Sequence, residues 1–238
     1  MSAKQCLSKI FESILLVVDV HFQQSYRPTG RFNDVKKYYS FKHWDYGLKT
    51  QTLHYLDGAL VHSSPHYPGN THDFEIFKKH ISKVNRLLRK TEEETDQPDE
   101  ELLSEEYPEL WAILGDKAYT GGDDYTRMIS IMKENQMLTN ADQRRNRALS
   151  RERVIIENYY GRMLMLWGII KKIYTYEHDS YDTIFSVCGS LTNYHMIRNP
   201  LRAEEGDFYK EHVANQDRKL ILLYHVNICF LCSNNRQT

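Results

Sequence analysis

The sequence predicts a mixed α/β fold, and three observations lead to this prediction. Residues 14–20 and 110–115 are short apolar runs without alternation, which is typical of strands buried on both faces. Residues 48–56 and 59–63 are strand-like and flank Asp57-Gly58, a dipeptide that favours the tight turn of an antiparallel hairpin. A helix is predicted from apolar residues that recur at helical spacing, namely Phe74, Phe77, Ile81, Val84 and Leu88.

The remaining segments complete the expected order of elements. Residues 22–42 are polar and contain Pro28 and Gly30, so we expect a long surface loop. Residues 91–109 are rich in like charges that cannot bury themselves, which predicts a solvated loop or a weak helix. Further helices are expected over residues 124–135, 150–167 and 181–198.

The length of 238 residues corresponds to one large domain or two small ones. We expect an N-terminal extension over residues 1–13, a folded α/β domain over residues 14–200 with an acidic insertion at 91–109, and a C-terminal tail over residues 201–238. The formal net charge of −1 hides an asymmetry, because ten acidic and no basic residues lie between Glu92 and Glu109. Outside that stretch 31 basic residues face 22 acidic ones, which gives a charge of +9 and favours a polyanionic partner.

Several classes of protein are excluded by composition. No apolar run approaches the roughly 18–20 residues of a membrane span, so we expect no membrane partner. The apolar stretch at residues 14–18 is too short for the core of a signal peptide. Four cysteines in a chain of this length do not form a disulfide scaffold, which favours a reducing compartment, either nucleus or cytoplasm.

Three carboxylates have a placement that suits metal chemistry. Asp19 and Asp116 each follow an apolar strand, and Glu157 lies on the helical run around residue 157. Side chains at the carboxyl ends of strands project into a crevice where ligands bind. Converging carboxylates repel one another, and a hard divalent cation such as Mg²⁺ removes that conflict. Two such ions can activate a nucleophile and stabilise the leaving oxygen in phosphodiester cleavage.

Asp73, in the segment PGNTHD, is a further candidate metal ligand with a competing structural explanation. If Asn70 is the N-cap of the helix that follows, Asp73 occupies the third helical position, where an acid stabilises the helix start. We favour the capping role because it requires no ion.

A basic stretch between residues 141 and 172 is the candidate DNA-binding surface. A stripe of cations suits a phosphate backbone, although a charged helix face is more commonly only solvated. Arg153 lies four residues before Glu157 and therefore on the same side of a helix, where it could orient Glu157 or hold a phosphate. The arginines assigned to DNA binding are Arg144, Arg145, Arg147, Arg151, Arg153 and Arg162.

The order of three segments resembles a known family. PGNTHD, ILGDKAY and NRALSRERVIIENYYGR follow a buried strand ending in Asp, and this set is similar to the DDE superfamily endonucleases of the PIF/Harbinger transposase type. The resemblance covers roughly residues 14–198 and implies an RNase H-like fold, a catalytic domain over residues 14–200, and cleavage of DNA by Mg²⁺ or Mn²⁺. By this resemblance the catalytic and metal-binding residues are Asp19, Asp116 and Glu157.

The sequence also departs from the family pattern. Val20-His21 replaces the small residue and Thr that often follow the first Asp, and Leu164 stands where related transposases often carry Lys. Only about 13 residues precede the first strand, so we expect no helix-turn-helix there. Sequence recognition would then come from a missing segment or from a partner, such as the separate Myb-like DNA-binding protein of Harbinger elements. The alternative is therefore a domesticated, catalytically inactive protein that binds DNA or such a partner. A third reading is an RNase H-like enzyme acting on RNA.

The resemblance also indicates where the protein acts and with what. DNA is the expected partner, the nucleus the expected compartment, and a homo-oligomer is an open alternative.

Overall fold

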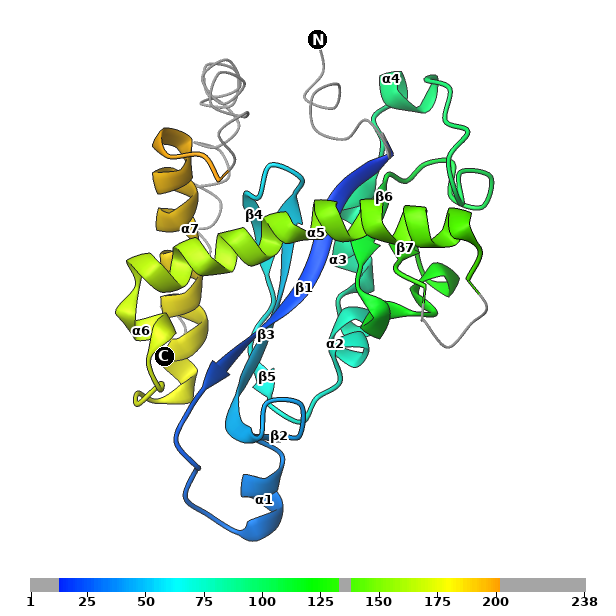
Figure 1. Ribbon diagram of the computed structural model, residues 1–238. Coiled ribbons are helices and arrows are strands. Elements are labelled where there is room, and N and C mark those ends of the chain that lie inside the picture. Colours follow the sequence, from blue (N-terminus) through cyan, green and yellow to red (C-terminus); the bar gives the residue numbers. More distant parts are fainter. Residues whose placement is uncertain (1–12, 133–137, 202–238) are drawn as a thin grey trace. The chain divides into compact units, whose positions relative to one another are not determined.

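The computed structural model describes residues 13–132 and 138–201 (Figure 1). The chain divides into two units after Asn193, and the fold and candidate site lie in the first unit. Almost all of the expected N-terminal extension and C-terminal tail lie outside the described residues. In the described part of the chain no helix combines the length and apolar character needed to cross a membrane.

A mixed sheet forms the centre of this unit. Its main path runs β2-β3-β1-β6-β7, and two short strands add to β3. β1 pairs antiparallel with β3 and parallel with β6, and β6 pairs parallel with β7. The strands are β1 (Ile14–Gln24), β2 (Tyr39–Ser40), β3 (Asp45–Tyr55), β4 (Leu60–Ser63), β5 (Tyr67–Pro68), β6 (Ala112–Gly115) and β7 (Met128–Ser130).

The predicted hairpin is confirmed, and the strand before it is longer than predicted. β3 and β4 pair antiparallel around Asp57-Gly58, and Gly58 adopts a φ of 92°, which favours glycine. β1 continues to Gln24 because its last residues pair with residues 47–49 of β3. The prediction of a single loop over residues 22–42 was therefore wrong. The first residues of this range belong to β1, and the range also contains α1 (Phe32–Lys36) and β2.

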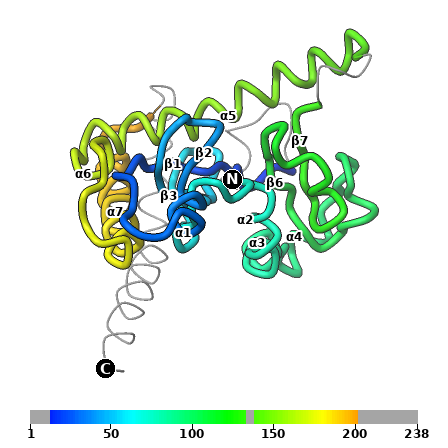
Figure 2. The backbone as a smooth tube through the Cα atoms, turned by 90° about the horizontal axis from the view of Figure 1, so that it is seen from below, coloured from blue at the N-terminus to red at the C-terminus, as the bar shows by residue number. Residues whose placement is uncertain are grey.

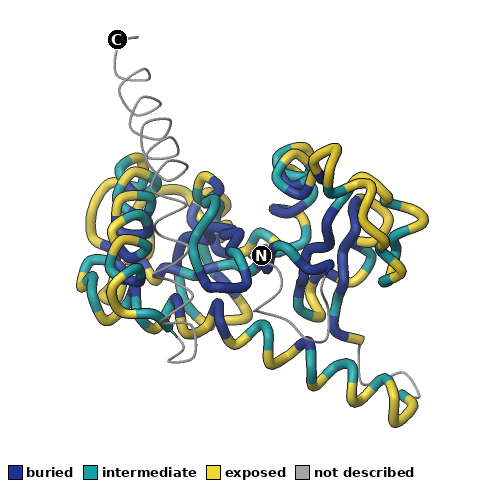
Figure 3. Tube along the Cα trace, turned by 90° about the horizontal axis from the view of Figure 1, so that it is seen from above, coloured by how far each residue is buried: buried dark blue, intermediate teal, exposed yellow. Residues whose placement is uncertain are grey.

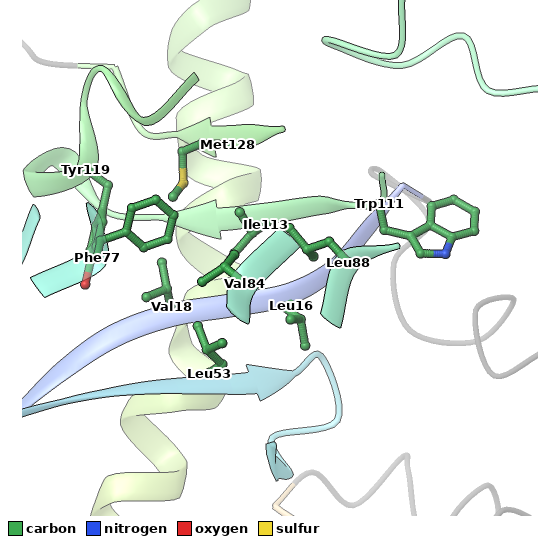
Figure 4. Close-up of a cluster of buried hydrophobic side chains, with 10 residues drawn as sticks. All are labelled: Leu16, Val18, Leu53, Phe77, Val84, Leu88, Trp111, Ile113, Tyr119 and Met128. Atoms are coloured by element: carbon green, nitrogen blue, oxygen red, sulfur yellow. The ribbon is translucent and has the colours of Figure 1, made fainter. Parts of the chain in front are cut away.

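One face of the sheet is covered by two helices in place of the single helix predicted after residue 71. α2 (Asp73–Lys79) and α3 (Ile81–Leu88) are separated by His80, whose backbone leaves the helical conformation. The predicted apolar residues of both helices still face the sheet, where they contact Leu16 and Val18 of β1 and Ile113 of β6 (Figure 4).

The other face is crossed by α5 (Asn140–Leu166), so that the strands lie between α5 and the α2–α3 pair (Figure 2). Leu149 and Ile156 of α5 pack against Val17 of β1 and Leu114 of β6. The helix begins ten residues before the predicted start at residue 150. Thr139 and Asp142 form a capping box there, in which each side chain accepts a hydrogen bond from the other's backbone N–H.

The helix predicted over residues 124–135 is absent from the described part of that segment. A short 3-10 helix, η3 (Gly122–Asp124), is followed instead by β7, which pairs with β6. Met128 and Ile129 are buried in the two cores on opposite faces of the sheet. A run this short is stabilised by the neighbouring strand, and the sequence alone does not reveal that neighbour.

The acidic segment was predicted to be a solvated loop or a weak helix, but it is not solvated throughout. It contains one helical turn, α4 (Glu92–Thr95), and is held to the sheet through Asp99. Asp99 accepts hydrogen bonds from the fully buried guanidinium of Arg127 and from Lys90, whose side chain is also buried. The acidic segment is held in place because Asp99 supplies the negative charge that balances the buried side chains of Arg127 and Lys90.

α6 (Gly168–Lys171) and a 3-10 turn, η4 (His178–Ser180), lead to α7 (Tyr181–Arg198), whose bounds match the prediction. Figure 3 shows buried strands and a largely exposed outer side of α5. A mixed sheet of this order with helices on both faces confirms the predicted α/β, RNase H-like fold.

Candidate active site

Asp19 and Asp116 lie at the same edge of the sheet. In the parallel pairing of β1 with β6, Val17 stands opposite Leu114. Asp19 comes two residues after Val17, and Asp116 comes two residues after Leu114. The register therefore places the two carboxylates beside each other. We predicted that Asp19 ends its strand, and this prediction was wrong because β1 continues to Gln24. The Asp19 side chain reaches a crevice because β6 ends beside it at Gly115 while β1 continues.

Asp19 lies in a partly desolvated position with one cation beside it. Its side chain is 22% exposed, its Oδ1 accepts a hydrogen bond from the backbone N–H of Val20 at 2.8 Å, and its Oδ2 lies 3.2 Å from the Arg153 guanidinium. Burial raises the pKa of Asp19, Arg153 lowers it, and the nearby charge of Asp116 raises it again, with a net upward shift. A carboxylate held in this way gains from an additional cation.

Asp116 is oriented by the turn that follows β6. It is the N-cap of η2 (Lys117–Tyr119), and its Oδ1 accepts a hydrogen bond from the backbone N–H of Ala118 at 2.8 Å. The chain folds back sharply because Gly115 has no side chain: a Cβ there would lie 2.9 Å from both Met128 Sδ and Tyr119 Cβ. The Gly-Asp-Lys sequence thus fixes the direction of the carboxylate.

Glu157 is exposed on α5 and lies close in angle to Arg153. At about 100° per residue, Arg153 and Glu157 are separated by only about 40° around the helix axis. Among residues 13–132 and 138–201, no three Asp, Glu, His or Cys side chains are close enough to hold one metal ion. The register therefore brings Asp19 and Asp116 together, and Glu157 does not form a three-carboxylate metal cluster with them among the described residues.

A cavity of about 590 Å³ adjoins Asp116. One wall is the end of β6 with the turn after it, and the other is α5. Asn146 ties α5 to this wall, because its side chain exchanges two hydrogen bonds of 3.1 Å with the backbone of Met132. The lining residues are Asp116, Lys117, Ile131, Asn146, Arg147, Ser150, Arg151 and Arg153.

All six predicted DNA-binding arginines lie on α5, and three of them line the cavity. Arg147, Arg151 and Arg153 line the cavity. Arg144 is exposed and outside it, and its Nε donates to the carbonyl of Asn140 at 3.3 Å. Arg145 is half-buried, and burial lowers its pKa. Arg162 lies two turns beyond the cavity on the same helix. The structure thus gathers cations beside Asp116 from only part of the predicted set.

Asp73 takes part in an ion pair rather than in the predicted capping box. The N-cap of α2 is His72, not Asn70, and Asp73 is the first helical residue. Its Oδ1 lies 2.9 Å from the Nζ of Lys49, a buried residue of β3, and its Oδ2 lies 3.4 Å from Lys42. Two lysines already neutralise Asp73, which weakens the argument for Asp73 as a metal ligand.

The sequence analysis did not find the side chains that surround Asp19 from β3 and α5. Thr52 stands opposite Asp19 in the β1–β3 register, and its hydroxyl shares a hydrogen bond with Tyr160 of α5. Tyr160 is partly buried, and its pKa is raised well above the usual value by desolvation and by the charge of Asp19. Only the pairing of β1 with β3 shows that Thr52 lies beside Asp19, and that pairing cannot be predicted from the sequence.

His21, which departs from the family pattern, has a structural role. Its ring lies between Tyr160 and Phe185, and burial lowers its pKa to about 4. It is therefore neutral at physiological pH and belongs to the interior on the α5 face.

Comparison with known proteins agrees with this geometry. The family model described as DDE superfamily endonuclease matches residues 21–193. The chain belongs to the DDE superfamily endonucleases. The match contains Asp116 and Glu157 and begins two residues after Asp19. The superfamily part of the resemblance is thus confirmed, while the PIF/Harbinger subtype stays a prediction.

One similar protein supports a relation to transposases. The chain is 24% identical over 196 residues to a protein named "Probable transposase for insertion sequence element IS702" from Microchaete diplosiphon. The alignment covers 81% of this chain and 61% of that relative, so the chain spans about three-fifths of the relative's length. No solved structure matches this chain.

Proposed function

We propose that this chain carries the catalytic domain of a metal-dependent DNA endonuclease of the transposase type. The observation that carries the proposal is the parallel register of β1 and β6, which sets Asp19 beside Asp116 next to a cavity lined by arginines. Membership in the DDE superfamily endonucleases supports the reaction class. Hydrolysis of a phosphodiester, followed by strand transfer, is the activity we assign.

The carboxylates of Asp19 and Asp116 fit a divalent cation. Both supply oxygen ligands at one edge of the sheet, and the charge of Asp116 raises the pKa of Asp19. Bound Mg²⁺ or Mn²⁺ would supply activation of the attacking oxygen and stabilisation of the leaving oxygen. Asp19 and Asp116 would hold the ions, and Glu157 would be the third carboxylate of the set.

The remaining polar residues would place the DNA. Arg153 holds Asp19 in a fixed direction through its 3.2 Å contact and offsets part of its charge. Arg147 and Arg151 line the same cavity as Asp116 and would bind the phosphates on either side of the bond to be cut. Action on chromosomal DNA would place the protein in the nucleus, and a separate Myb-like protein would supply sequence recognition.

A plasmid-nicking assay tests this function. With Mg²⁺ or Mn²⁺ present, we expect the protein to nick supercoiled DNA and Asp116→Asn to abolish nicking. Asp124→Asn, which neutralises an exposed carboxylate eight residues away in η3, is the matched control and should keep wild-type activity. Nicking that survives in Asp116→Asn would refute the assignment.

The alternative function is a catalytically inactive protein that binds DNA or a Myb-like partner. It is favoured by the ion pair in which Arg153 already neutralises Asp19 at 3.2 Å. Mn²⁺ titration followed by electron paramagnetic resonance separates the two functions. An inactive protein would shift DNA in a gel containing EDTA yet show the same Mn²⁺ binding in wild type and in Asp116→Asn.

A further inference from the structure

The β2–β3 hairpin presents two large aromatic side chains to solvent close to the candidate site. Ser40 pairs with Asp45, so the hairpin is closed by the four-residue turn 41–44. Phe41 is 65% exposed and Trp44 is 77% exposed, although rings of this size normally gain stability by burial.

The backbone of this turn is held in a costly conformation. Trp44 has a φ of 55°, in the left-handed region that suits glycine or asparagine. Such a conformation is strained for a residue with a Cβ and recurs at sites that bind ligands. Burial of Trp44 does not offset that cost, because the ring is in solvent.

The turn is anchored, so the two rings are displayed on a firm base. The His43 ring stacks on Phe22 of β1 with centroids 4.1 Å apart and planes 3° from parallel. The Tyr39 and Phe41 rings meet edge to face with their centroids 5.2 Å apart, which leaves Phe41 exposed.

The surroundings of the turn are positively charged and adjoin the candidate site. Residues 26–46 contain five Lys or Arg against two Asp, a charge of +3. Lys42, between the two exposed rings in sequence, lies 3.4 Å from Asp73, and its charge also acts on Asp19. Lys42 therefore links the turn to the edge of the sheet where the candidate catalytic carboxylates lie.

We propose that the 41–44 turn binds unpaired bases of a DNA strand next to the phosphodiester to be cut, with Phe41 and Trp44 stacking on the bases and Lys42 contacting the backbone. This inference rests on the proposed function and specifies its substrate as DNA with locally unpaired bases. The cations favour a polyanion over an apolar protein surface. Unpaired bases are favoured over duplex because only they offer free ring faces for stacking.

Binding to two DNA probes in EDTA tests the inference without cleavage. One probe is a fork with an unpaired arm, and the other is a blunt duplex of equal length. Trp44→Asn keeps a residue that tolerates the positive φ, and we expect it and Phe41→Ala each to weaken fork binding about tenfold, with duplex affinity changed less than twofold. Phe32→Ala, which removes another exposed ring (69%) from α1, is the matched control and should change neither affinity.

The possible outcomes separate this inference from the proposed function. Fork binding that is unchanged in Trp44→Asn, or that falls together with duplex binding, overturns the inference while DNA binding itself stands. A wild-type protein that binds neither probe contradicts the proposed function. If light scattering shows instead that Trp44→Asn converts a dimer to a monomer with fork affinity unchanged, the turn is a self-association surface and the inference is wrong.

Discussion

Replacement of Asp99 by asparagine should strongly destabilise the fold. The Asp99 carboxylate accepts hydrogen bonds from Arg127 Nη1 at 2.6 Å, from Arg127 Nη2 at 2.9 Å and from Lys90 Nζ at 2.8 Å. The side chains of Arg127 and Lys90 are 0% and 2% exposed. In Asp99→Asn both buried cations lose their counter-charge.

Breaking a buried ion pair from one side costs about 3–5 kcal/mol in the free energy of unfolding. For a domain of this size that corresponds to a melting temperature about 6–20 °C lower. Urea unfolding followed by circular dichroism measures the free energy, and scanning calorimetry measures the temperature. Asp96→Asn, in the same acidic segment but exposed, is the matched control and should change the free energy by less than about 0.5 kcal/mol.

The effect of Asp99 should also depend on pH. The hydrogen bonds from Arg127 hold the pKa of Asp99 well below its usual range. A carboxyl group with a lowered pKa in the folded state stabilises the fold fully above its unfolded pKa, about 3.9, and this contribution is lost as the pH falls toward the folded value. The difference between wild type and Asp99→Asn should be constant from about pH 5 to 8 and shrink below about pH 4. Equal stability of Asp99→Asn and Asp96→Asn at pH 7 would refute the reasoning.

Three further changes test other parts of the structure. Neutralising exposed acids of the acidic segment should tighten DNA binding at low salt, and unchanged affinity in fluorescence polarisation would contradict this expectation. Deleting the whole segment should instead unfold the protein, because Asp99 would be lost. The exposed acids to replace by Gln are Glu92, Glu93, Glu105 and Glu106. Gly115→Ala should lose about 1–3 kcal/mol in urea unfolding, because the new Cβ meets Met128 and Tyr119, and full stability would show that the turn can relax. Mn²⁺ affinity should fall as the pH is lowered through the raised pKa of Asp19, and Arg153→Gln should move that midpoint to higher pH while Arg144→Gln leaves it in place.

Local signals in the sequence accounted for the elements that depend on local chemistry. Asp57-Gly58 predicted the β3–β4 turn because the required positive φ is a property of glycine itself. α7 was predicted with the bounds that the structure shows, Tyr181–Arg198. The early start of α5 could also have been found, since Thr139 and Asp142 have the spacing of a capping box.

Elements that depend on distant partners were missed. β7 is three residues long and is a strand because β6 lies beside it. The end of β1 extends past Asp19 because β3 pairs with it there, and no local pattern in residues 22–24 shows this. Asp99 is largely shielded from solvent because it pairs with Arg127, which lies 28 residues away in sequence.

The sequence by itself determined the fold class, the family and the identity of the candidate carboxylates, because these depend on patterns of residues that are close together in the sequence. The tertiary structure decided which of those carboxylates meet. The parallel register of β1 and β6 sets Asp19 beside Asp116, the path of α5 delivers Arg153 to Asp19, and the β2–β3 hairpin brings Lys42 to the same edge. Electrostatic interactions fall off with distance in space rather than in sequence, so the charge that each carboxylate experiences is fixed only when the chain has folded.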